Sequence, residues 1–290
     1  IPFRPLLRSR ICLICDDRCP APSPGPNQTV MRIRMRETQR LRFYGRDGQD
    51  LVGILDRPTE NMKFQAIFAH CFTCTKDLKA AVKISRALVE LGIGVFRFDF
   101  TGLGESGGDF SRSTFEGNCD DLKAAIEFVG TLGPAPTLLI GHSLGGAASL
   151  ATACNADTIR GVCSLAAPSD TPHLEAKLRA MNSELASRGE GKVTIGGSDF
   201  MIREPLLASL REFSLEPRVR SLNKPVLLVH SPTDQTLEIE HAYRLREWLG
   251  KWASLHVLQD ADHLFTTHPG DTRYVAQLIN LWAGRNGIPV

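Results

Sequence analysis

Residues 137–154 read TLLIGHSLGGAASLATAC, and this stretch decides the fold of the chain. Three of its first four residues are apolar, which suits a buried strand, whereas its last ten suit a helix rich in alanine and glycine. Between them lies the pattern GHSLG at residues 141–145. In this position the pattern indicates a sharp turn that lifts a serine hydroxyl clear of the backbone, with glycines where side chains would collide. The stretch therefore predicts that Ser143 is a nucleophile.

Apolar runs of strand length alternate with helical patterns on both sides of this stretch. The predicted strands are residues 64–70, 93–98, 137–140, 161–166, 225–230 and 254–258. The predicted helices are residues 77–91, 115–132, 145–154, 238–249 and 271–283. Strands that are apolar on both faces and alternate with amphipathic helices predict an α/β fold, with a mostly parallel central sheet and helices on both faces. Residues 39–44 and 51–55 alternate around a GRDG turn and predict an antiparallel hairpin at the N-terminal edge.

Residues 169–216 interrupt this alternation. They contain a helical stripe, a hairpin around two glycines at 196 and 197, and a second short helix from Glu204. Because an insertion between two sheet strands cannot lie in the sheet, we expect a small cap over the strand ends. We expect this cap to contribute to substrate binding and to set the size of the substrate. The prediction is one domain over residues 38–290 that carries this insertion.

Residues 1–37 differ in composition from the rest of the chain. They are basic and contain the proline-rich run PAPSPGP at 20–26, which suits neither a helix nor a central strand. We expect a disordered extension, with Met31 or Met35 near the true start; a transit peptide is the alternative. The whole chain has 34 basic and 32 acidic residues. We therefore predict neither nucleic acid nor a membrane surface as a partner, and the sequence has no apolar run long enough for a membrane span.

Eight cysteines in 290 residues are too sparse for a disulfide scaffold. Without an export signal, we expect reduced thiols and a cytoplasmic location. Cys12, Cys15 and Cys19 would suit a zinc knuckle, but no fourth ligand follows nearby. We therefore predict no metal site.

A serine nucleophile needs a base and an orienting carboxylate, which follow it along the chain in the order acid, then histidine. Asp234 comes after the strand at 225–230, and His263 comes after the strand at 254–258. Active sites in parallel sheets lie at the carboxyl ends of the strands, where both residues fall. We predict Ser143, Asp234 and His263 as a catalytic triad.

Three other residues compete for roles beside this triad. Asp260 and Asp262 are runner-up acids, but they lie so close to His263 in sequence that they would struggle to reach the far nitrogen of its ring. His142 precedes the nucleophile, and we expect its side chain to point away and pack against neighbouring residues.

An oxyanion hole needs two donors aimed at the tetrahedral oxygen. We predict the backbone N–H groups of Leu144, which follows the nucleophile, and Phe72, in the loop after the first central strand. Cys71 and Cys74 flank Phe72 in this loop. We interpret them as small residues that fit a tight loop; a redox pair that distorts the donor loop on oxidation is the alternative.

Two longer runs, HCFTCTKDL at 70–78 and RFDFTGLGESGGDF at 97–110, accompany the GHSLGG elbow. Together they resemble the α/β-hydrolase fold, and more closely the hydrolase half of a bacterial family in which an α/β hydrolase is fused to an OsmC-like domain. The resemblance covers residues 38–286 and implies a carboxylesterase-like serine hydrolase. It also implies an OsmC-like partner domain, which this chain, ending at Val290, does not contain. Either that domain was removed or this is a free-standing version.

These observations predict a serine esterase that cleaves small, short-acyl esters through an acyl-enzyme intermediate, without a metal or organic cofactor. Perhydrolase or amidase activity from the same triad is one alternative, since the pocket chooses leaving group and acceptor. A non-catalytic binding module of the same fold is the other. The sequence indicates neither the physiological substrate nor the oligomeric state.

Overall fold

The computed structural model describes residues 36–288 of the chain. All described residues belong to one unit, Arg34–Val290. The predicted N-terminal extension, its transit-peptide alternative and the cysteines at 12, 15 and 19 therefore lie outside the described residues. The extension was expected to reach residue 37, but Arg36 and Glu37 already belong to the first strand.

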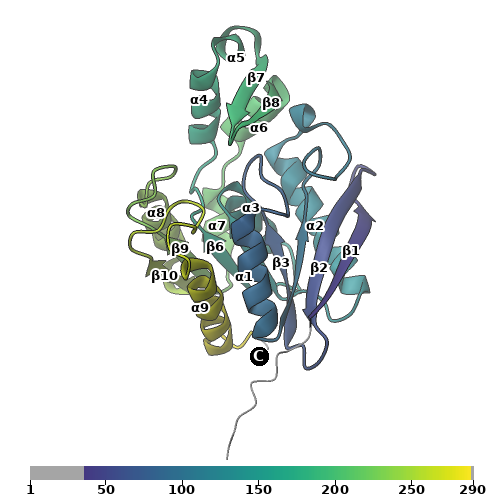
Figure 1. Ribbon diagram of the computed structural model, residues 1–290. Helices are drawn as coiled ribbons and strands as arrows, with labels where there is room; N and C mark the ends of the chain where they lie inside the picture. The colour runs from purple at the N-terminus through teal and green to yellow at the C-terminus, as the bar shows by residue number, and fades with distance from the viewer. Residues whose placement is uncertain (1–35, 289–290) are drawn as a thin grey trace, which may run out of the picture. The chain divides into compact units, whose positions relative to one another are not determined.

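The described residues contain an eight-stranded sheet with the order β1-β2-β4-β3-β5-β6-β9-β10 (Figure 1). Its strands are β1 (Arg36–Tyr44), β2 (Asp50–Pro58), β3 (Phe64–Ala69), β4 (Ile93–Phe98), β5 (Leu138–His142), β6 (Gly161–Leu165), β9 (Val226–His230) and β10 (Ala253–Val257). The pairs β1·β2 and β2·β4 are antiparallel, and all other neighbours are parallel. The predicted N-terminal hairpin and parallel sheet are confirmed.

Helices cover both faces of this sheet. The helices are α1 (Lys79–Glu90), α2 (Phe115–Thr131), α3 (Leu144–Ala153), α8 (Glu240–Leu249) and α9 (Asp271–Arg285), with short 3₁₀ turns η1 (Phe110–Arg112) and η2 (Gly250–Trp252). Leu138 and Ile140 of β5 pack in the apolar cluster that includes α1 and α9, whereas Leu139 packs in the cluster with α2 and α3. Successive strand residues point to opposite faces, so an apolar run buries both faces at once.

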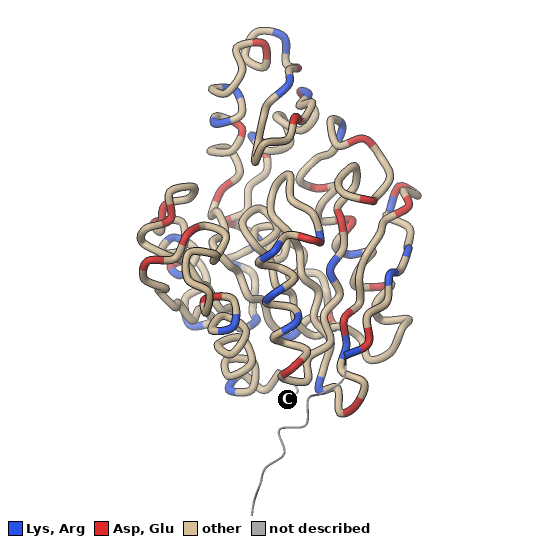
Figure 2. Tube along the Cα trace, in the orientation of Figure 1, with Lys and Arg blue, Asp and Glu red and all other residues tan. Residues whose placement is uncertain are grey.

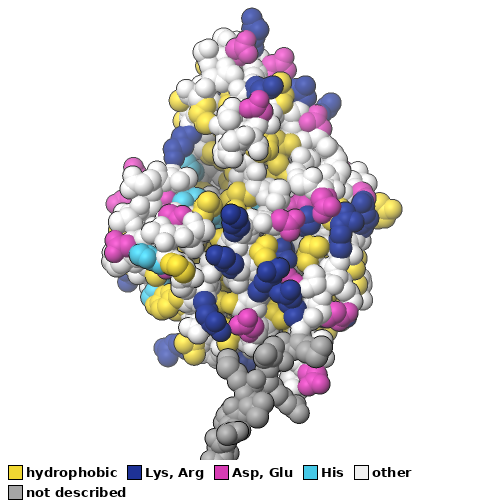
Figure 3. All heavy atoms as spheres, viewed as in Figure 1, with side chains coloured by type: hydrophobic (Ala, Val, Ile, Leu, Met, Phe, Trp, Pro, Cys, Tyr) yellow, Lys and Arg dark blue, Asp and Glu magenta, His cyan; other side chains and the backbone are white. Residues whose placement is uncertain are grey.

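The chain between β6 and β9 adds no strand to the eight-stranded sheet. It forms α4 (Pro172–Met181), α5 (Ser183–Arg188), a separate hairpin of β7 (Glu190–Ile195) and β8 (Ser198–Arg203), α6 (Glu204–Glu212) and α7 (Glu216–Ser221). We call residues 172–212 the cap segment. Ser209 of this segment accepts a hydrogen bond of 2.7 Å from the amide of Phe115, and Phe200 packs edge-on against Phe110. Hydrophobic side chains gather on the face in Figure 3 where the cap segment meets the rest of the unit.

Basic and acidic residues are interspersed along the described part of the chain (Figure 2). The pattern agrees with the near-neutral charge of the whole sequence, +2. Over residues 36–288, none of the helices combines the length and the apolar character that crossing a membrane requires.

Candidate active site

Ser143 stands at a strained turn between β5 and α3. Its backbone has φ 52° and ψ −123°, a conformation that residues with a side chain rarely adopt. The turn is held by the Ser143 amide, which donates to the carbonyl of Leu165 at 2.9 Å. A Cβ atom on Gly145 would lie 2.3 Å from the His70 carbonyl oxygen, and one on Gly141 would lie 2.3 Å from the Gly145 carbonyl oxygen. Glycine is therefore required on both sides of the serine, as the motif predicts.

Asp234 and His263 meet in the loops that follow β9 and β10. The Asp234 Oδ2 atom accepts a hydrogen bond of 2.7 Å from His263 Nδ1, and its Oδ1 atom accepts from the amides of Thr236 (2.8 Å) and Leu237 (3.0 Å). Burial by itself would raise the pKa of Asp234, but the His263 contact and the two amide bonds outweigh it and hold the pKa below its usual value. The carboxylate is thus ionised and fixed in orientation.

The two runner-up acids do not reach the His263 ring. Asp262 instead accepts hydrogen bonds from the backbone and hydroxyl of Thr266 and from the amide of Thr267 within its own loop. Asp260 is exposed and has φ 57°. Within residues 36–288, Asp234 is the carboxylate that hydrogen-bonds to His263.

The residue before Ser143 contacts the loop that carries His263, but the serine hydroxyl makes no direct bond to the Asp234–His263 pair. The ring of His142, the residue before Ser143, lies 4.9 Å from the ring of His263. No hydrogen bond joins the Ser143 hydroxyl to His263 in the described part of the chain. Catalytic hydrogen bonds of unliganded enzymes are often long and tighten when substrate binds, so this geometry is compatible with base catalysis.

The two predicted oxyanion donors line one pocket. Phe72 and Leu144 both border a small space that is also bounded by Phe100 and Phe110. Neither the Phe72 nor the Leu144 amide donates a hydrogen bond to another residue of the described chain. Leu144 is also the first residue of α3, where the helix dipole favours negative charge. Both amides are therefore available to an anionic oxygen.

A buried ion network braces the loop that carries Phe72. Lys76 donates from its amide and its Nζ atom to Asp99, at 2.6 and 3.0 Å, and lies 2.6 Å from Glu105. Arg97 donates to the Lys76 carbonyl at 2.6 Å. Burial would lower the pKa of Lys76, but its hydrogen bonds to Glu105, Asp77 and Asp99 raise the pKa, so the side chain stays charged. Sequence reasoning missed this network, because residues far apart in sequence form it without a shared motif.

Cys71 and Cys74 form a disulfide on either side of Phe72. This differs from the expectation of reduced thiols and from the interpretation of the pair as merely small residues. The amide of Cys74 also donates to the Cys71 carbonyl at 3.1 Å, and Thr73 has φ 58°. The bridge closes a tight turn around the predicted donor, because two cysteines three positions apart can bond only if the chain folds back. Three other described cysteines, Cys119, Cys154 and Cys163, are free.

Two buried histidines contact the candidate triad, and sequence reasoning assigned neither a role. His142 was expected to pack against neighbouring residues, and it is buried; the expectation did not include the contact of its Nε2 atom with the backbone oxygen of His263, at 2.7 Å. His230 Nε2 lies 2.9 Å from the Leu237 carbonyl oxygen and 3.6 Å from Asp234 Oδ2. Burial lowers the pKa of both histidines, so they are neutral. Strand alternation could have predicted the His142 contact, because His142 lies on the face of β5 that the loop carrying His263 covers.

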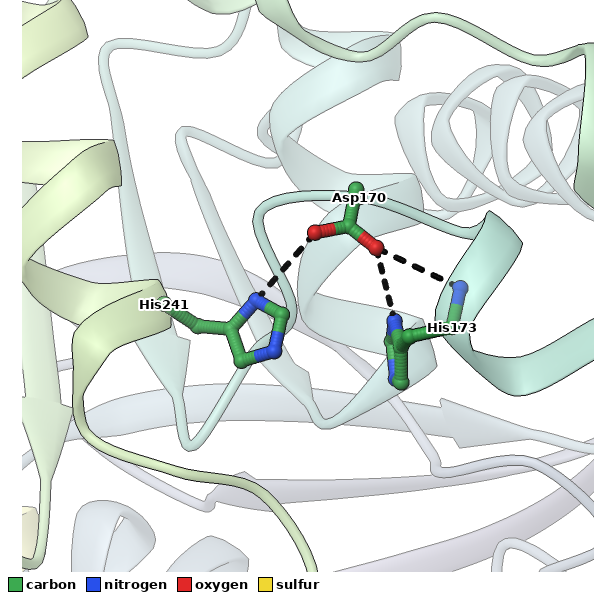
Figure 4. Close-up of side chains that lie close together, drawn as sticks. All are labelled: Asp170, His173 and His241. Atoms are coloured by element: carbon green, nitrogen blue, oxygen red, sulfur yellow. Dashed lines mark hydrogen bonds and ion pairs between the residues drawn. The ribbon is translucent and has the colours of Figure 1, made fainter. Parts of the chain in front are cut away.

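Asp170, His173 and His241 have residue types and spacing that could hold a metal, with ligand atoms within 4.8 Å of one another. Asp170 lies between the two rings, 3.0 Å from His173 Nδ1 and 3.6 Å from His241 Nδ1 (Figure 4). However, His241 Nδ1 already accepts from the Ser169 amide at 3.1 Å. The Arg244 guanidinium also lies 3.1 Å from this nitrogen and 3.4 Å from Asp170. A metal ion would find the lone pair of His241 Nδ1 already engaged by the Ser169 amide, and the positive charge of Arg244 beside it. We therefore interpret the cluster as a link between α4 and α8.

Comparisons with known proteins agree with this fold. The model of the alpha/beta hydrolase family matches residues 66–273. The esterase domain of a Rhodothermus marinus protein is 37% identical, with a TM-score of 0.68 over 86% of this chain and 98% of that chain. The uncharacterized protein YfhR of Escherichia coli O157:H7 is 26% identical over 278 residues, which cover 91% of this chain and 84% of that protein.

A further similarity is to the lysophosphatidylserine lipase ABHD12 of Danio rerio, at 24% identity over 193 residues. The match covers 66% of this chain and 48% of the lipase, so the chain spans about half of that relative. The family match covers the parallel strands from β3 onward except the first two residues of β3, the serine elbow, and the loops that carry Asp234 and His263. The chain therefore belongs to the alpha/beta hydrolase family.

Proposed function

We propose that this chain is a serine esterase that cleaves small carboxylic esters with Ser143, His263 and Asp234. The observation that carries the proposal is the 2.7 Å hydrogen bond between Asp234 Oδ2 and His263 Nδ1 beside the serine elbow. The two residues are 29 positions apart and lie on loops after neighbouring strands, next to a serine with φ 52°. Pure binding makes no demand for this combination.

In the first step, Ser143 Oγ attacks the ester carbonyl while His263 Nε2 accepts the hydroxyl proton. Asp234 holds the proton on Nδ1, which leaves the Nε2 lone pair facing the serine, and it stabilises the imidazolium that forms. The carbonyl oxygen becomes negative and is bound by the amides of Leu144 and Phe72. His263 then gives its proton to the departing alcohol, and the acyl group remains on Ser143.

In the second step, water attacks the acyl-enzyme. His263 accepts a proton from the water, the same two amides bind the oxyanion, and the serine leaves with the proton that His263 returns. Every proton transfer uses a residue of this chain, so the scheme needs no metal or organic cofactor.

The space beside the oxyanion donors supports a short acyl group. The pocket that Phe72 and Leu144 line is small, and Phe100 and Phe110 bound it with aromatic rings. Such a space suits a small, uncharged group. We therefore propose acetyl and similarly short esters as substrates.

Covalent labelling by a fluorophosphonate tests the nucleophile. The parent protein should gain one phosphonyl group, and Ser143→Ala should gain none and lose activity on the order of 10⁶-fold. Ser164→Ala is a matched control: Ser164 is buried on β6, its hydroxyl has no partner in the described chain, and the variant should label like the parent. A folded parent that does not label would contradict the proposal and favour a binding module.

Rates on p-nitrophenyl esters of increasing acyl length then test the substrate class. We expect the highest kcat/KM for acetate and a steep fall with each longer chain. Faster turnover of anilides, or of acyl transfer to hydrogen peroxide, would instead favour an amidase or a perhydrolase.

A further inference from the structure

His142 connects the serine elbow to the loop that bears the proposed base. It is the last residue of β5, it directly precedes Ser143, and it is 3% exposed. Its Nε2 atom lies 2.7 Å from the backbone oxygen of His263, 121 positions along the chain. Its ring also lies 4.9 Å from the ring of His263 and 6.1 Å from that of Phe265.

The hydrogen bond defines the state of the His142 ring. A carbonyl oxygen can only accept, so Nε2 carries the hydrogen and Nδ1 carries a lone pair. That Nδ1 atom is buried and has no hydrogen-bond partner among residues 36–288. Burial lowers the pKa of His142 to about 3, so the ring is a neutral donor at ordinary pH.

Packing alone does not account for a histidine at this position. A buried acceptor without a partner lowers stability, and an apolar side chain would avoid that cost. Leu138 and Ile140, which share this face of β5, are apolar. His142 is the residue that departs from the apolar pattern of this face, and it is also the one that contacts the loop of the proposed base, His263. Such departures are characteristic of functional sites.

The hydrogen bonds of Asp262 and Asp234 hold other parts of the loop and ring of His263. Asp262 bonds to the backbone of Thr266 and Thr267, which shapes the loop itself. Asp234 holds the ring at Nδ1. In the described chain, the hydrogen bond from His142 is the one that joins the His263 carbonyl to the strand that ends next to Ser143.

We propose that His142 is a positioning residue, whose Nε2–H group holds the His263 backbone so that the imidazole faces the Ser143 hydroxyl. The inference rests on the proposed function for its effect on catalysis. The contact itself can be tested without activity.

Two substitutions separate the donor from the bulk of the side chain. His142→Phe keeps a ring and removes the donor, whereas His142→Gln keeps an N–H group near the Nε2 position. We expect His142→Phe to lower kcat on the order of 10²-fold, the effect of a misplacement of about 1 Å, with KM unchanged. His142→Gln should recover most of the loss. Ile140→Val, on the same face of the same strand, is the control for packing and should keep the parental kcat.

Hydrogen–deuterium exchange over residues 259–270 provides the second measurement. We expect faster exchange in His142→Phe, and near-parental exchange in His142→Gln and Ile140→Val. Equal kcat in all variants, or a folded His142→Gln as impaired as His142→Phe, would overturn the catalytic role. A parent that fails to label with fluorophosphonate would contradict the proposed function, and unchanged exchange in His142→Phe would by itself overturn the contact.

Discussion

Replacing Asp234 by asparagine tests the triad at its most constrained point. Asp234 Oδ1 accepts hydrogen bonds from the amides of Thr236 and Leu237, at 2.8 and 3.0 Å. Only an oxygen can occupy this site, so the amide group of asparagine must face His263 Nδ1, where Oδ2 now accepts at 2.7 Å. The two N–H groups would oppose each other unless His263 moves its proton to Nε2.

This change of tautomer removes the base. With a hydrogen on Nε2, His263 has no lone pair facing Ser143 and cannot accept its proton. We expect Asp234→Asn to lower kcat by about 10⁴-fold, the loss seen when a triad histidine holds the wrong tautomer. This corresponds to about 5 kcal/mol of transition-state stabilisation. KM should change little, because the pocket that Phe72 and Leu144 line is untouched.

The assay is kcat and KM on p-nitrophenyl acetate, with a thermal melt of each variant to establish that it is folded. Asp260→Asn is the matched control. Asp260 lies three positions before His263, is exposed, and has φ 57°, which asparagine tolerates well. It should keep the parental kcat. Near-parental activity in Asp234→Asn, or an equal loss in Asp260→Asn, would refute the assignment of the acid.

Two further predictions concern residues around the site. Burial raises the pKa of Asp121 to about 6 from 3.8, so between these pH values the folded chain holds a proton that the unfolded chain has lost, and stability falls as pH rises. Asp121→Asn keeps an acceptor for the Thr101 amide. It should raise the free energy of unfolding by up to about 3 kcal/mol at pH 8 and by little at pH 4. Urea titrations measure both values, and an equal gain at the two pH values would contradict the prediction. Reduction of the Cys71–Cys74 disulfide frees the turn around Phe72, so a reductant should lower kcat of the parent. The same reductant should leave kcat of the Cys71→Ser/Cys74→Ser double variant unchanged. Identical parental rates with and without the reductant would count against a role for the bridge.

The regular elements could be predicted closely because each depends on its own residues. The helix predicted at 115–132 is α2, Phe115–Thr131, and the strand predicted at 93–98 is β4, Ile93–Phe98. A strand buried on both faces must be apolar throughout, and a helix between a sheet and solvent must carry an apolar residue every three to four positions. The six-residue helix α7 was not predicted, because it is too short to show such a period.

The candidate site was predictable where strand ends locate it. Parallel strands place their carboxyl ends along one edge, so Ser143, Asp234 and His263 could be proposed from their positions after three strands. The sequence also favoured Asp234 over Asp260 and Asp262, which lie too close to His263 in the chain, but the 2.7 Å hydrogen bond itself depends on how two loops close over that edge. No local pattern encodes that closure.

The sequence by itself determined the order of strands and helices, the strained turn at Ser143 and the residue types that stand at the strand ends. Only the tertiary structure decided that His142 reaches the backbone of His263, that Lys76 lies between Asp99 and Glu105, and that Cys71 bonds to Cys74. The reason is physical: periodicity and turn chemistry act over a few neighbouring residues, whereas the first two contacts join segments that meet only when the sheet is packed. The third depends on a loop whose path is set by the ion network beside it.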